Sequence, residues 1–152
     1  MKTKYLYNLI IVISLFIFTG CVSKNNSEID YNLNDSSNYS EVSTMKIIIN
    51  NNEYLINLEN NETVSAFIKL LPQEFSMTEL NGNEKYVYLD YTLPTNQYNP
   101  KHIKAGDVML YGNNCLVIFY KSFDTSYSYT KIGHIDNLPD LGSNDLVVNI
   151  VK

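Results

Sequence analysis

The sequence contains no arginine and no tryptophan, so all 11 of its basic residues are lysines. Acidic residues number 16, and the formal net charge is −5. A protein that binds nucleic acid needs a basic surface to neutralise phosphates, so this balance argues against a nucleic-acid partner. Only 6 glycines are present, and none of them belongs to a Gly-rich phosphate-binding motif.

Residues with catalytic or metal-binding side chains are also scarce. Two histidines, His102 and His134, do not make a metal site on their own, and we expect neither a metal nor another cofactor. No Gly-x-Ser-x-Gly motif marks a nucleophile, although a Ser-His-Asp set that meets only in space stays open. Cys115 begins an apolar stretch, so we interpret it as a buried hydrophobic residue rather than a nucleophile. Asp107 is expected to bind backbone amides at the start of its strand.

The sequence has no hydrophobic run long enough for a membrane-spanning helix, which needs roughly 17–25 apolar residues. The longest run, Leu9–Phe18, is short and is interrupted by Ser14. Lys2 and Lys4 precede it, and polar residues follow it. This layout predicts a secretory signal peptide over residues 1–20.

The end of this segment, Phe18-Thr19-Gly20-Cys21, resembles a bacterial lipobox. The resemblance implies that Cys21 receives a diacylglyceryl group and becomes the first residue after cleavage. The protein would then be a lipoprotein with a further acyl chain such as palmitate. We therefore expect a protein anchored in membrane lipid through Cys21, on the extracytoplasmic face of the cell membrane. An ordinary cleaved signal peptide and an uncleaved anchor are the alternatives. With Cys21 acylated, Cys115 would have no disulfide partner.

The remaining chain divides by composition. Residues 21–44 are rich in Ser, Asn, Asp and Glu without a sustained apolar period, so a flexible tether is expected there. Residues 45–152 carry the alternating apolar pattern of strands. Strands are expected over 46–50, 53–58, 75–80, 84–89, 107–111, 115–120, 131–136 and 146–151, with tight turns at Asn51-Asn52 and Asn81-Gly82.

One helix of about ten residues is expected after Asn60-Asn61, because Val64, Phe67, Ile68 and Leu71 lie at helical spacing and Pro72 ends the segment. A single helical turn is expected over 137–142, and a loop over 90–106. Many strands without a βαβ rhythm predict a mainly β fold, a small barrel or sandwich.

Several segments of the chain form an ordered set: Leu80–Tyr86, Leu93–Asn96, Ala105–Tyr111, Cys115–Tyr120, Ser122-Phe123, Thr125–Thr130 and Ile132-Gly133. Together they resemble the bacterial cyclophilin-like fold domain, a family of poorly defined function, and the resemblance covers essentially all of 45–152. The resemblance implies a closed antiparallel cyclophilin-like β-barrel of about eight strands with one or two short helices. Some members occur beside or fused to flavodoxin-like proteins, which implies a flavodoxin-like partner as one alternative.

Prolyl isomerase activity does not follow from this resemblance, because a fold does not fix a function. True cyclophilins carry a Phe-x-Arg segment and a Gln-Gly-Gly-Asp segment, and the arginine donates a hydrogen bond to the twisting prolyl amide. This sequence has neither segment, and lysine lacks the planar donor fork of arginine. We therefore predict no catalytic residues.

Tyrosine is abundant, with 13 residues. Tyrosine side chains bury ring area while their hydroxyls seek polar partners, so a patch of them suits a peptide, a sugar or a flat ring. The alternative is a set of tyrosines on the solvent side of a sheet without a ligand. We take Glu84 as a residue that could orient a ligand, although an exposed, solvated turn residue is the simpler reading. The candidate ligand-binding residues are Glu84, Tyr86, Tyr88, Tyr111, Tyr120, Phe123, Thr125, Tyr127 and Tyr129.

Three hypotheses follow for the function. The first is a membrane-anchored, non-catalytic domain that binds a peptide or small aromatic ligand. The second is an enzyme or redox accessory, either a prolyl isomerase or a protein associated with a flavoprotein. The third is a structural envelope protein, for which the tyrosines would lie scattered in space.

Overall fold

The computed structural model describes residues 43–152, which form ten strands and one helix. The predicted signal peptide, Cys21 and nearly all of the predicted tether lie outside these residues. The elements are β1 (Thr44–Ile49), β2 (Asn52–Leu58), α1 (Glu62–Ile68), β3 (Gln73–Leu80), β4 (Glu84–Tyr88), β5 (His102–Ile103), β6 (Asp107–Tyr111), β7 (Cys115–Phe119), β8 (Phe123–Asp124), β9 (Thr130–Ile135) and β10 (Leu146–Val151). Within this part of the chain, no helix has the length and apolar character needed to cross a membrane.

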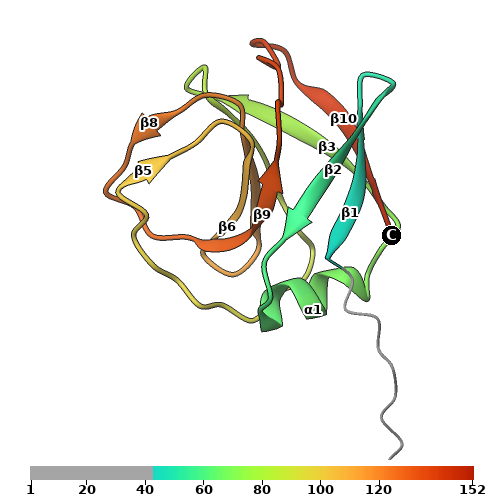
Figure 1. Ribbon diagram of the computed structural model, residues 1–152, viewed down its shortest axis with the longest axis vertical. Helices are drawn as coiled ribbons and strands as arrows, with labels where there is room; N and C mark the ends of the chain where they lie inside the picture. The colour runs from blue at the N-terminus through green and yellow to red at the C-terminus, as the bar shows by residue number, and fades with distance from the viewer. Residues whose placement is uncertain (1–42) are drawn as a thin grey trace, which may run out of the picture. The chain divides into compact units, whose positions relative to one another are not determined.

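Eight of the strands close into an antiparallel barrel in the order β1-β10-β3-β4-β7-β6-β9-β2, and β2 pairs with β1 to complete the ring. The expected closed antiparallel barrel is therefore confirmed. β5 and β8 form a separate two-stranded sheet outside one side of the barrel, and α1 lies at one end (Figure 1). The loop expected over 90–106 thus contains a short strand that its polar sequence did not indicate.

Local sequence explains the tight turns. Asn50 and Asn51 have φ values of 49° and 65°, which asparagine tolerates better than most residues, and they join β1 to β2. The turn comes one residue before the predicted position. Asn81 and Gly82, with φ of 57° and 69°, make the turn between β3 and β4 as predicted.

Helix α1 begins where the sequence predicts and ends early. The side chain of Asn61 caps it by accepting a hydrogen bond from Val64 N at 2.9 Å. The helix has 7 residues rather than about ten, because the chain tightens after it and Leu70 N bonds Phe67 O at 3.0 Å. The helical turn predicted over 137–142 is wrong. Asn137 has a φ of 56°, which a right-handed helix does not accommodate.

The barrel interior holds the main core. Alternate residues of each strand point inward, such as Met45, Ile47 and Ile49 of β1. Lys85 of β4 is also fully buried there, and its Nζ donates to the carbonyls of Gly142 at 2.6 Å and Asn144 at 2.8 Å. Burial lowers the pKa of Lys85, and the nearby acids Glu79, Asp145 and Asp140 oppose that shift.

A second apolar cluster lies outside the barrel, on the outer face of β6 and β7. It contains Ile103, Met109, Cys115, Val117, Phe119 and Tyr129, with Tyr86 and Phe123 packed against it. The small sheet of β5 and β8 contributes Ile103 and Phe123 to this cluster. The central strands are apolar on both faces because both faces are covered.

Candidate functional site: an aromatic pocket on the outer barrel face

The outer face of β4, β7 and β6 carries a pocket of about 320 Å³. We call it the aromatic pocket. Its walls come from these strands, from the turn between β3 and β4, and from the segment that begins at β8. The lining residues are Leu80, Asn81, Asn83, Glu84, Tyr86, Tyr88, Tyr111, Cys115, Val117, Phe123, Tyr127 and Tyr129.

Cross-strand pairing explains why these side chains meet. Tyr88 of β4 and Tyr111 of β6 both pair with Cys115 of β7, so the cysteine lies between the two tyrosines. Two residues further along β4 and β7, Tyr86 pairs with Val117. Residues paired directly across antiparallel strands place their side chains on the same face. The register therefore builds a floor with aromatic rings on either side.

The floor and the rim of the pocket differ in exposure. Cys115, Val117 and Tyr129 are buried, whereas Tyr88, Tyr111 and Tyr127 are 63%, 43% and 62% exposed. The rim thus presents ring surface to solvent above an apolar floor.

Ring-to-ring contacts hold the rim in place. Tyr111 contacts Tyr127 edge-on, with centroids 6.0 Å apart, and Tyr129 at 5.6 Å. Tyr86 and Tyr88 form a second edge-to-face pair at 5.8 Å. Such pairs add roughly 0.5–1.5 kcal/mol beyond the area they bury. The exposed rings are therefore positioned before any ligand arrives.

Glu84 is the one acidic residue in the pocket lining. The reading of Glu84 as an exposed, solvated turn residue is wrong, because Glu84 is the first residue of β4 and is partly buried. Burial raises its pKa from 4.5 to about 6, and the neighbouring charge of Glu79 adds to the shift. Glu84 is ionised at neutral pH, in an environment that disfavours its charge.

A second acceptor lies beside Glu84. The side-chain oxygen of Asn83 is buried and has no hydrogen-bond partner within residues 43–152. Buried polar atoms in native proteins are nearly always paired, so this oxygen is an exception within the turn between β3 and β4. The backbone carbonyl of Asn83 is occupied, because it accepts from Tyr120 N at 3.0 Å and Lys121 N at 3.3 Å.

Cys115 fits the description of a buried hydrophobic residue. Burial raises the pKa of its thiol to about 11, with a smaller contribution from Glu84. A thiol that stays protonated at neutral pH is a poor nucleophile. Its place in the pocket floor was not anticipated from sequence, since that depends on its pairing with Tyr88 and Tyr111.

Seven of the nine candidate residues line the pocket, and two do not. Tyr120 follows the last outward-facing residue of β7, so its ring turns inward to the main core, where its hydroxyl donates to Glu79 Oε1 at 3.2 Å. Burial raises its pKa to about 12. Thr125 lies outside the lining and its hydroxyl accepts from Tyr127 N at 3.1 Å, so it braces the loop. Leu80, Asn81, Asn83 and Val117 are lining residues that the sequence did not reveal.

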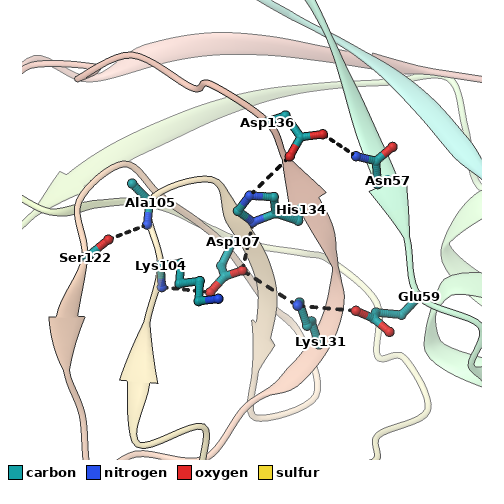
Figure 2. A network of polar contacts seen from close by, with 9 residues as sticks. All are labelled: Asn57, Glu59, Lys104, Ala105, Asp107, Ser122, Lys131, His134 and Asp136. Carbon is teal, nitrogen blue, oxygen red and sulfur yellow. Dashed lines mark hydrogen bonds and ion pairs between the residues drawn. The ribbon is translucent and has the colours of Figure 1, made fainter.

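A polar network surrounds Asp107, at the start of β6 (Figure 2). Asp107 accepts from Lys104 N at 2.9 Å, which confirms its expected role in binding a backbone amide. His134 Nδ1 lies 3.0 Å from Asp107, and its Nε2 lies 3.7 Å from Asp136 (Figure 2). Lys131 Nζ bridges Asp107 at 3.8 Å and Glu59 at 3.3 Å. These contacts tie β6, β9 and the end of β2 together.

This network does not contain a nucleophile. Both ring nitrogens of His134 face aspartates, and Ser122 instead accepts from Ala105 N at 2.9 Å (Figure 2). No Ser-His-Asp set is therefore formed around His134 in the part of the chain that the structure describes. Residues 43–152 include no group of three His, Cys, Asp or Glu side chains that could hold a metal ion.

Comparison with known proteins gives one finding about family. A sequence profile of the Cyclophilin-like family matches residues 47–151, which span the barrel except for the first three residues of β1. No curated protein and no solved structure matches the chain.

Proposed function

The chain belongs to the Cyclophilin-like family, and from the pocket on its barrel we propose that it is a non-catalytic binding domain. The ligand is a peptide or a small aromatic molecule, held in the aromatic pocket. The observation that carries this proposal is the exposure of Tyr88, Tyr111 and Tyr127 above a buried apolar floor. The site is proposed for a domain anchored in membrane lipid through acylated Cys21.

The chemistry of the pocket supports binding. Ligand pockets usually combine apolar or aromatic walls with a few polar groups that fix orientation. This pocket has about 320 Å³, the lower end of the usual range, which suits one side chain or one small ring. Rigid rings lose little conformational entropy when a ligand binds, so preformed tyrosine walls favour affinity.

The same lining argues against catalysis. Cys115 is a protonated thiol, and Glu84 has no base or second acid of the lining beside it. General acid–base chemistry and nucleophilic catalysis both need an activated group with a positioned partner. The sequence also supplies no arginine to assist twisting of a prolyl amide.

Calorimetric titration of the full-length chain with N-acetyl-phenylalanine amide tests the proposal. We expect saturable binding that weakens about tenfold in Tyr127→Ala, because the ring closes one side of the pocket. Tyr98→Ala is the matched control, since Tyr98 is 45% exposed and lies outside the lining. Equal losses in both variants, or no saturable binding, would contradict a ligand site in the aromatic pocket.

The proposed anchor is tested separately, by labelling growing bacteria that produce the chain with an alkyne analogue of palmitate. Label should enter the wild-type chain and be absent from Cys21→Ser. Label retained in Cys21→Ser would refute acylation at this residue.

A further inference from the structure

We propose that the aromatic pocket takes a cationic group with N–H donors, such as the guanidinium of an arginine side chain in a peptide ligand. The cation lies between the tyrosine rings and against Glu84. This inference rests on the proposed function and adds the charge and the hydrogen-bonding character of the ligand.

The charges around the pocket favour a cation. Glu84 is the one charged residue of the lining, and no lysine belongs to it. Lys85, the next residue along β4, points to the other side of the wall, where it donates to Gly142 and Asn144. Glu79 on β3 adds a second negative charge near Glu84. An incoming cation therefore meets an acidic residue of the lining and no basic one.

The rings of the rim favour a cation as well. The face of an aromatic ring is electron-rich, and a cation within about 6 Å of the ring centre is attracted to it. The ring of Tyr111 contacts those of Tyr127 and Tyr129, with centroids 6.0 and 5.6 Å apart, and Tyr86 and Tyr88 form a pair on β4. Arginine is the cation that stacks best on such surfaces, because its guanidinium is planar and weakly hydrated.

The carboxylate of Glu84 distinguishes a guanidinium or primary ammonium from a quaternary ammonium. Glu84 lines the pocket and is only partly buried, so its oxygens can accept hydrogen bonds from a ligand. A guanidinium carries five N–H donors, whereas a quaternary ammonium carries none.

The acid–base state of Glu84 is consistent with this ligand. The titratable groups that interact with Glu84 are Glu79 on β3, Cys115 on β7, Tyr120 after β7 and Tyr129 before β9, and none of them is cationic. Burial and Glu79 raise the pKa of Glu84 to about 6. A bound cation would offset both effects, so its binding should lower that pKa and strengthen as pH rises through about 6.

The test compares two probes that differ in charge and hardly in shape, N-acetyl-arginine amide and N-acetyl-citrulline amide. Calorimetric titration of the full-length chain at pH 7.5 should give at least about tenfold tighter binding of the arginine probe. At pH 5 that preference should shrink, because most of Glu84 is then protonated. Equal affinities for the two probes, or no binding of either, would overturn the inference.

Variants assign the preference to Glu84. Glu84→Gln should bring the arginine probe down to the affinity of the citrulline probe. Glu74→Gln is the control, because Glu74 is an exposed acid of β3 outside the lining and its loss changes the net charge equally. Retention of the preference in Glu84→Gln would refute the assignment. N-acetyl-phenylalanine amide separates the proposed ligand site from the proposed preference for a cation. If this probe binds but the arginine probe binds no more tightly than the citrulline probe, the aromatic pocket is still a ligand site and only the preference for a cation is refuted.

Discussion

The two faces of the wall formed by β4, β7 and β6 differ in how they are covered. The inner face carries residues such as Leu110, Leu116 and Ile118, all with no solvent exposure, and it is sealed by the closed barrel. The outer face is covered by β5, β8 and the segment that follows, and this cover leaves Tyr88 and Tyr111 partly exposed. A barrel closes its own interior, whereas an added layer can leave an opening. The opening is where the ligand site is proposed.

Glu84 and Lys85 are consecutive residues that lie on opposite faces of this wall. Lys85 is buried in the interior, and two backbone carbonyls accept from its ammonium group. Glu84 is partly buried on the outer side, beside another acid. A buried charge is tolerated when it is paired and is costly when it is not. The interior charge therefore serves the fold, whereas the outer one is a candidate for function.

The largest expected effect is on the free energy of unfolding, which should respond very differently to substitutions on the inner and outer faces of the wall. Leu116→Ala on the inner face should lower the free energy of unfolding by about 2–5 kcal/mol, because it leaves a cavity in a closed core. Tyr88→Ala on the rim should lower it by less than about 1 kcal/mol, since the ring is largely exposed. Urea unfolding followed by circular dichroism measures both. Comparable losses would show that the rim contributes to the fold as much as the interior does.

Cys115 offers a probe of how tightly the floor is closed. Its raised thiol pKa of about 11 leaves about 100-fold less thiolate at pH 8 than a pKa of 9 would. In a Cys21→Ser background, Ellman's reagent should thus react with the folded chain at least about 100 times more slowly than with the urea-unfolded chain. Similar rates would mean that the floor is open to solvent.

Much of this fold could be predicted from the sequence, because it rests on local signals. Asn81-Gly82 specifies a turn, alternating residues specify strands, and Asn61 caps the helix. The closed barrel came from family resemblance. The predictions that failed depend on local backbone conformation, as at Asn137, or on packing that a short polar segment does not reveal, as at β5.

The candidate site was predictable in part for a similar reason. Alternation places Glu84, Tyr86 and Tyr88 on one face of β4 without any tertiary knowledge. That Cys115 and Val117 form the floor depends on the pairing of β4 with β7, strands that are not consecutive in sequence. Tyr120 was misassigned because residues 115–120 are apolar on both faces, so the sequence does not show which face turns into the barrel.

The pH dependence of stability in the Glu84→Gln variant tests whether the charge of Glu84 on the outer face is costly to the fold. The pKa of Glu84 is raised from 4.5 to about 6 in the folded chain, so folding loses stability as pH rises through that window. Replacing the acid removes the loss. At pH 7 the variant should be more stable by on the order of 1 kcal/mol, and near pH 4 the two chains should be equal. Urea titrations at both pH values measure this difference. A variant that is less stable than the wild type at pH 7 would contradict the claim that burial of the Glu84 charge destabilises the fold.

The smallest expected effect concerns prolyl isomerase activity. The pocket lining contains no basic side chain to donate into a twisting prolyl amide. In a protease-coupled assay with a Xaa-Pro peptide, the full-length chain should not exceed the uncatalysed rate. Activity approaching that of a true cyclophilin would mean that another group replaces the missing arginine, and the non-catalytic assignment would be wrong.

Binding of ligands on the outer face of the barrel can be distinguished from binding elsewhere on the domain by an NMR titration. A second hollow, of about 440 Å³, is lined by Asn60–Thr63 and Pro94–Asn96 near the start of α1 and contains no aromatic residue. In a ¹H–¹⁵N NMR titration of the full-length chain with N-acetyl-phenylalanine amide, we predict saturable shifts in β4, in the β6–β7 hairpin and in residues 123–129. Shifts centred on the hollow near α1, or no saturable shifts, would contradict the account.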